Sequence, residues 1–134
     1  MAVVIPLFMY LPDALNVRDE TFHSGEFIAE RAERILFEFD AIGPKVVGTN
    51  ANENITVKLL QREMGKIEET MNREMYDLEV DLQQVSGAYL HWSMINMYQG
   101  VQNLVVKLSC KNSNSDNYLL VNSHFDSKPG SPGI

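Results

Sequence analysis

The spacing of apolar residues changes once along the chain, and this change limits the folds open to it. Between residues 27 and 71, apolar side chains recur every three or four positions, as they do on one face of an α-helix. From Tyr76 the period becomes two, because Leu78, Val80 and Leu82 alternate with acidic or amide side chains. Helices followed by strands predict a layered α/β structure.

Two helices are predicted in the first half of the chain. The first should follow Ser24, a favourable N-cap residue, and end at Gly43, which suits the left-handed position after a helix. The second should begin near Asn52. Each helix carries an apolar stripe, formed in the first by Phe27, Ile28, Ile35, Leu36 and Phe39, and in the second by Val57, Leu60, Met64, Ile67 and Met71.

Three strands are predicted in the second half. The first begins near Tyr76 and should end at a turn marked by Ser86-Gly87. The second is "NLVVKLSC" (103–110), and the third is "YLLVN" (118–122), which is apolar enough to be buried on both faces. Residues 89–97 are compatible with either strand or loop. We therefore expect an α/β fold with two N-terminal helices followed by strands of a mixed sheet.

Length and charge exclude some functions. The 134 residues suffice for one compact domain. Eighteen acidic residues against eleven basic ones give a net charge of -7, which disfavours nucleic acid or an anionic membrane surface as the main partner. The single cysteine excludes an internal disulfide.

The first eleven residues, "MAVVIPLFMYL", are nearly all apolar. A membrane-spanning helix needs about 20 such residues, so this stretch is too short to span a bilayer. It could be a buried N-terminal segment. It could equally be the trailing end of a transmembrane helix that begins outside this chain.

His124 and Asp126 are the residues best placed for chemistry. His124 directly follows the third predicted strand, and ligands of open α/β sheets bind at the carboxyl ends of strands. In an extended segment, residues i and i+2 project to the same side, so Asp126 could orient the imidazole of His124 toward a metal. On spacing alone, a histidine on a surface loop is the more common outcome. His23 and His91 have no comparable setting.

Asn54 begins the sequence Asn-Ile-Thr, an acceptor site for N-glycosylation. Such triplets are frequent by chance. This one would be informative if the domain faces a secretory lumen.

Several segments together resemble one family. They are "FIAERAERILFEFDAIGPKVVGTNANE", "DLEVDLQQVSGAY", "MYQGVQNLVVKLS" and "YLLVNSHFDSKPGSPG". In this order and spacing they are similar to the start of the lumenal peptidase domain in the membrane-bound di-zinc aminopeptidase-like peptidases of the endoplasmic reticulum. The similarity covers residues 11–133.

The resemblance implies an incomplete three-layer fold of the zinc-aminopeptidase type and a parent enzyme that cleaves peptides. His124 matches the first zinc ligand, and Asp126 matches the carboxylate that supports the metal site. Residues 1–11 match the end of the first transmembrane helix, and residues 12–134 match the N-terminal part of the peptidase domain. Glycosylation of Asn54 fits a lumenal surface.

The family pattern continues beyond "SPG" with an Asp-Asp segment, a Glu-Glu pair, a further acidic ligand and a final His. The Glu-Glu pair contains the general base. Because a catalytic zinc usually takes three protein ligands, this chain alone is expected to bind zinc weakly and to be inactive. Two alternatives stay open: a non-catalytic binding domain with a peptidase-like fold, and a self-sufficient α/β domain with His124 on a loop.

Overall fold

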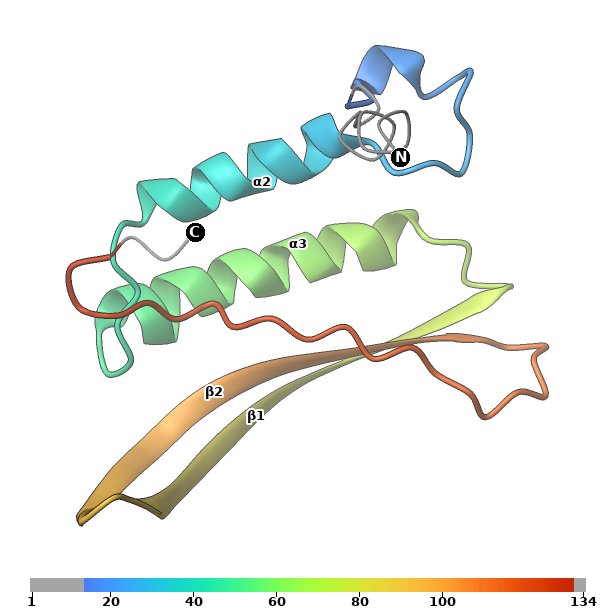
Figure 1. Ribbon diagram of the computed structural model, residues 1–134. Helices are drawn as coiled ribbons and strands as arrows, with labels where there is room; N and C mark the ends of the chain where they lie inside the picture. Colours follow the sequence, from blue (N-terminus) through green and yellow to red (C-terminus); the bar gives the residue numbers. More distant parts are fainter. Residues whose placement is uncertain (1–13, 132–134) are drawn as a thin grey trace, which may run out of the picture. The chain divides into compact units, whose positions relative to one another are not determined.

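The computed structural model describes residues 14–131 and divides the chain into two units, Met1–Ala41 and Ile42–Ile134. The first unit contains the short 3-10 helix η1 (Val17–Asp19) and the helix α2 (Ala29–Ala41). The second contains the π-helical turn η2 (Ala51–Thr56), the helix α3 (Val57–Thr70), and the strands β1 (Tyr76–His91) and β2 (Met94–Cys110), as Figure 1 shows.

The first predicted helix is confirmed as α2, although it begins at Ala29, five residues after Ser24. Its end is where the sequence places it, because Gly43 adopts a φ of 76°, a left-handed conformation that glycine enters without steric cost. Of the predicted apolar stripe, Phe27 and Ile28 precede α2, and Ile28 is buried. No residue of α2 is buried, and Leu36 stays 52% exposed.

The second predicted helix is confirmed as η2 followed by α3. The Thr56 hydroxyl donates a hydrogen bond to the Ala51 carbonyl at 2.8 Å. This bond spans five residues, which is the spacing of a π-helix, and so it stabilises the π-helical turn η2. Val57 and Leu59 of α3 are buried. Of the predicted stripe, Val57 is buried and Ile67 remains 48% exposed.

The strands β1 and β2 form an antiparallel hairpin, with Tyr76 opposite Cys110 and His91 opposite Met94. The turn predicted at Ser86-Gly87 is wrong, because the strand continues through these residues with a β-bulge. Gly100 supplies the left-handed residue of the bulge, with a φ of 66°, and its N–H donates to Ser86 Oγ at 2.9 Å. The chain instead reverses at Trp92 and Ser93. Residues 89–97, for which the sequence allowed either strand or loop, therefore form the end of the hairpin.

The third predicted strand is also wrong. Residues 118–122 form no strand, and Leu119, Leu120 and Val121 are 83–91% exposed. The sheet formed by the described residues has only the strands β1 and β2. A strand buried on both faces needs a neighbour at each edge and cover on each face, which this unit does not supply to residues 118–122. The predicted α/β class is confirmed, and the combination of two helices with a two-stranded sheet is compatible with part of a peptidase-like fold.

Within the described part of the chain, no helix combines the length and the apolar character that a membrane crossing requires. The apolar segment 1–11, predicted to end a transmembrane helix, lies outside the residues that the structure describes.

Glu63 is a buried acidic residue on α3 whose charge is balanced by neighbours. Its carboxylate lies 2.7 Å from Lys66 Nζ and 2.9 Å from Arg62 Nη2. The hydrogen bond from Lys66, aided by Arg62, lowers the pKa of Glu63 despite the opposing effect of burial. The ionised carboxylate is therefore the form that the folded chain favours.

Replacing this carboxylate should reduce the acid sensitivity of the fold. Because the pKa of Glu63 is lower in the folded chain, its stabilising effect is present above the unfolded value of 4.5 and is lost as pH falls through the folded value. Between pH 7 and pH 3, the unfolding free energy of the wild type should fall further than that of Glu63→Gln, by up to about 1 kcal/mol. Urea unfolding at each pH measures this difference. Glu69→Gln, at an exposed position of α3, is the matched control and should behave as the wild type.

Candidate functional site

The segment that carries His124 is attached to the loop before η2 by a pair of hydrogen bonds. The Lys45 backbone N–H donates to Ser127 Oγ at 2.7 Å, and the Ser127 N–H donates to the Lys45 carbonyl at 3.0 Å. Asn52 Nδ2 donates to the same carbonyl, also at 3.0 Å. All three residues are buried. We call this arrangement the Lys45–Ser127 clamp.

The clamp fixes the backbone beside the predicted site residues. His124 Nδ1 lies 3.0 Å from the Asp126 carbonyl oxygen and 3.4 Å from the Asp126 carboxylate. An Nδ1–H that donates to Asp126 leaves Nε2 with its lone pair for another partner. The two side chains are 84% and 49% exposed, so the imidazole is open to a ligand.

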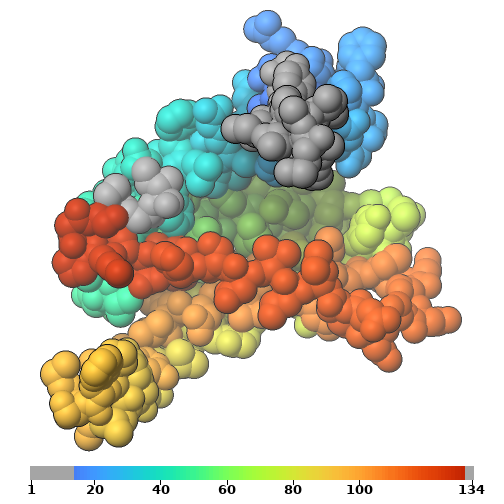
Figure 2. Space-filling model, viewed as in Figure 1, coloured from blue at the N-terminus to red at the C-terminus, as the bar shows by residue number. Residues whose placement is uncertain are grey.

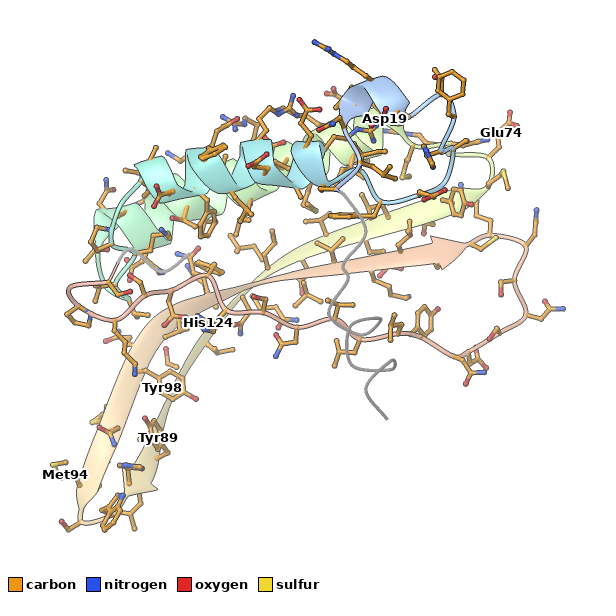
Figure 3. The ribbon with its side chains drawn as sticks, turned by 45° about the horizontal axis from the view of Figure 1, so that its top comes forward. Asp19, Glu74, Tyr89, Met94, Tyr98 and His124 are labelled. Carbon is orange, nitrogen blue, oxygen red and sulfur yellow. The ribbon has the colours of Figure 1, made fainter. Side chains whose placement is uncertain are left out.

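An open groove of about 350 Å³ lies beside these residues. Figure 3 shows His124 on the segment that follows the hairpin. Carboxamide side chains supply much of the polar lining: Asn52, Gln83, Gln102, Asn103 and Asn122. One of them, Gln102, donates to the Glu53 carbonyl at 3.2 Å and so links β2 to η2. The groove therefore presents neutral hydrogen-bonding groups next to His124.

The other two histidines are not among the residues that line this groove. In the first unit, His23 Nδ1 lies 3.0 Å from the Glu26 carboxylate, and the His23 side chain is partly exposed. His91 stands edge-on to Trp92 at the hairpin end, with ring centroids 6.3 Å apart. Across residues 14–131, no group of three or more His, Cys, Asp or Glu side chains is arranged to hold a metal ion.

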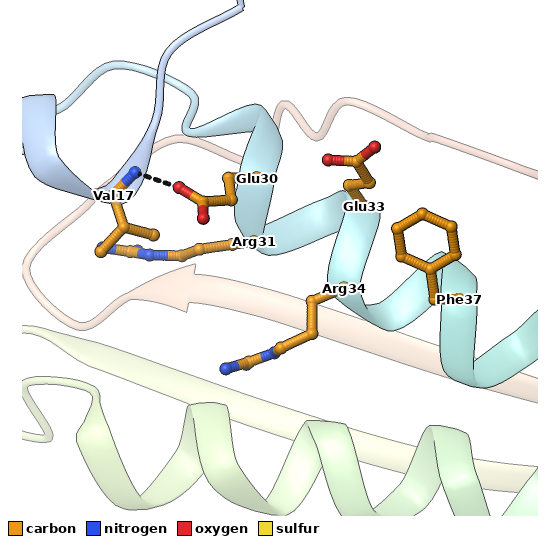
Figure 4. Close-up of a pocket in the computed structure, with 6 residues that line it drawn as sticks. All are labelled: Val17, Glu30, Arg31, Glu33, Arg34 and Phe37. Atoms are coloured by element: carbon orange, nitrogen blue, oxygen red, sulfur yellow. Dashed lines mark hydrogen bonds between the residues drawn. The ribbon is translucent and has the colours of Figure 1, made fainter.

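A second cavity, of about 310 Å³, lies in the first unit between η1 and α2. Figure 4 shows its lining and the hydrogen bond that Val17 N–H donates to Glu30 at 2.8 Å. Glu30 and Glu33 offset Arg31 and Arg34, and Arg31 is paired with Glu20. Acidic and basic side chains are equal in number here, and none is a predicted metal ligand, so the His124 groove is the better candidate site.

Curated proteins align with most of this chain. The human protein named "Endoplasmic reticulum metallopeptidase 1" is 32% identical over 122 residues, which cover 89% of this chain. Proteins of the same name from mouse and rat are 33% and 35% identical over 112 residues, or 81% of this chain. The chain is a relative of endoplasmic reticulum metallopeptidase 1. The resemblance expected from its sequence motifs is thereby confirmed.

The relationship covers only a small part of these relatives. The chain spans 12–13% of the length of the mouse, human and rat endoplasmic reticulum metallopeptidase 1 proteins. No protein-family profile and no solved structure matches the chain. The relatives are named as metallopeptidases, so the relationship is to a peptidase family.

Removing the Ser127 hydroxyl should loosen the site. In Ser127→Ala the buried Lys45 N–H loses its acceptor, which should cost roughly 1–3 kcal/mol. Amide hydrogen exchange should become faster at Lys45 and at position 127, and urea unfolding should show the lower stability. Ser123→Ala removes an exposed hydroxyl of the same segment and should leave both measurements unchanged. Equal effects of the two substitutions would contradict the clamp.

Proposed function

We propose that this chain supplies the first zinc ligand, His124, and its supporting carboxylate, Asp126, to a zinc-dependent metallopeptidase of the endoplasmic reticulum. The contact between His124 Nδ1 and Asp126 carries the proposal. The metallopeptidase relatives, which cover most of the chain, point to the same chemistry.

The donor set fits a zinc ligand and its supporting partner. A metal-bound histidine commonly donates its second ring N–H to a carbonyl or a carboxylate, which fixes the tautomer and the ring orientation. Asp126 offers both groups to Nδ1 of His124. His124 would hold the metal through the ring nitrogen that Asp126 leaves open, and bound zinc would lower the pKa of a water and polarise the scissile carbonyl of a peptide.

Residues 14–131 do not complete such a centre. A catalytic zinc usually takes three protein ligands, and these residues contain no group of three candidate ligand side chains. We therefore propose that they bind zinc weakly and do not hydrolyse peptides by themselves. The remaining ligands and the general base would come from segments that this part of the chain does not contain.

The groove beside His124 suits a peptide in chemical terms. Its carboxamides offer both donors and acceptors, as the main chain of a peptide does. We propose that in the complete site they face the peptide substrate of the parent enzyme.

We also propose that the domain faces the lumen of the endoplasmic reticulum and is attached to its membrane through the segment 1–11. The names of the relatives place them in this organelle. Asn54 is exposed, so a glycan could be attached there. The Thr56 hydroxyl of the same sequon is fully buried and bonded to Ala51, so it has a structural role as well.

A zinc titration followed by NMR tests the assignment of the metal ligand. As zinc is added to the 134-residue chain, the ring C–H signals of His124 should shift before those of His23 and His91. Asp126→Asn should weaken this response by roughly tenfold, the lower end for loss of a supporting partner. His91→Asn is the control and should leave it unchanged. A response of His23 alone, through its Glu26 neighbour, would overturn the assignment.

Expression with membranes of the endoplasmic reticulum tests the orientation of the domain. We expect a glycosidase-sensitive increase in mass, and Asn54→Gln should abolish it because its side chain cannot accept the glycan. Thr56→Ser keeps both the sequon and the hydroxyl and should retain the modification. A wild-type chain that stays unmodified would contradict the proposed lumenal exposure of Asn54.

A further inference from the structure

The end of the β1–β2 hairpin exposes a cluster of large apolar side chains. Their exposed fractions range from 56% to 87%, and they are Tyr89, Leu90, Trp92, Met94, Ile95 and Met97. We call this cluster the apolar tip. Figure 3 shows Tyr89 and Met94 at this end of the hairpin, and Figure 2 shows the same end, in yellow, standing clear of α3 and of the C-terminal segment. Monomeric soluble proteins rarely expose such a cluster without a function.

The hairpin around the apolar tip carries no fixed charge. Between Asp81 and Lys107 there is no Asp, Glu, Lys or Arg. The other ionisable side chains in this stretch are those of Tyr89, His91 and Tyr98. Charged side chains are the most costly groups to bring into a lipid bilayer, so their absence here makes contact with lipid energetically accessible.

The residue at the apex of the hairpin turn is a tryptophan, although the backbone conformation at this position is unfavourable for it. Trp92 adopts a φ of 57°, a left-handed conformation that favours Gly, Asn or Asp in a two-residue hairpin turn. Trp92 is also 87% exposed, so packing does not compensate for this strain. Glycine would be the better residue for folding alone, and the position therefore suits a function of the indole ring.

We propose that the apolar tip inserts into the interface of an electrically neutral lipid bilayer. Tryptophan and tyrosine prefer this interface because they join an apolar ring to a polar N–H or O–H, and Leu90 and Ile95 can reach the acyl chains. The chain carries a net charge of -7 and the hairpin end has no Lys or Arg, so an anionic bilayer would repel it.

The size of the apolar tip favours lipid over a protein partner. A stable protein interface uses roughly 20–30 residues on each side. The tip offers six apolar side chains on a protruding turn, whereas shallow insertion into a bilayer needs only a small apolar surface. The groove beside His124 is lined by residues outside the apolar tip, so this proposal does not depend on the proposed metal site.

Trp92 is the only tryptophan of the chain, so its fluorescence reports on the apolar tip alone. We would add vesicles of phosphatidylcholine to the 134-residue protein and record the emission maximum. Insertion should shift the emission to shorter wavelength, and phosphatidylcholine brominated on its acyl chains should quench it. Vesicles that contain phosphatidylserine should give a smaller shift.

Two double variants give the matched comparison. Leu90→Ser with Ile95→Ser removes apolar surface from the tip and should weaken partitioning roughly tenfold or more. Leu119→Ser with Leu120→Ser removes a similar surface from an exposed segment outside the tip and should partition as the wild type does. Circular dichroism establishes that the variants retain the fold.

Three results would overturn the proposal. The first is an emission maximum that vesicles do not change. The second is sedimentation with vesicles without any quenching of Trp92, which would assign the membrane contact to another segment such as residues 1–11. The third is a shift that depends on protein concentration and needs no vesicles, which would indicate that a second copy of the chain covers the tip.

Discussion

The pairing of Lys45 with Ser127 is the interaction on which the candidate site depends. It joins positions 82 residues apart, and it lies within the part of the second unit that is shielded from water. Each buried backbone N–H needs an acceptor, and here the two residues satisfy one another while Asn52 adds a third bond. Without this clamp, the segment of His124 would be held less firmly, because residues 118–122 join no sheet.

The remainder of the second unit is held largely by local structure. The hairpin is stabilised by its own ladder, and η2 and α3 form one continuous helical segment. Few apolar side chains are buried, and those of α3 are Val57 and Leu59. Apolar residues of both strands remain 41–57% exposed, among them Val80, Val105, Val106 and Leu108. The packing of the described residues therefore leaves much of the apolar surface of the hairpin open to solvent.

The candidate site is centred on a contact between two residues of one short segment. The carbonyl and the carboxylate of Asp126 lie 3.0 and 3.4 Å from Nδ1 of His124, and an Nδ1–H donated to either leaves Nε2 for another partner. The supporting residues were harder to foresee. Lys45, Asn52 and Ser127 have no motif or spacing that marks them, since a clamp between distant loops leaves no periodic pattern in the sequence. Only the close approach of the two backbones identifies them.

The sequence alone determined the two helices, the first two strands, the left-handed glycine that follows α2, and the resemblance to metallopeptidases. These features depend on local preferences and on linked motifs, which a single chain displays directly. The tertiary structure decided where the hairpin turns and whether "YLLVN" becomes a strand. Ser86-Gly87 has the composition of a turn, yet the ladder continues through it because Gly100 on the opposite strand absorbs the extra residue as a bulge. An apolar run becomes a buried strand only when neighbouring strands and helices cover it, and that cover is a property of the assembled fold.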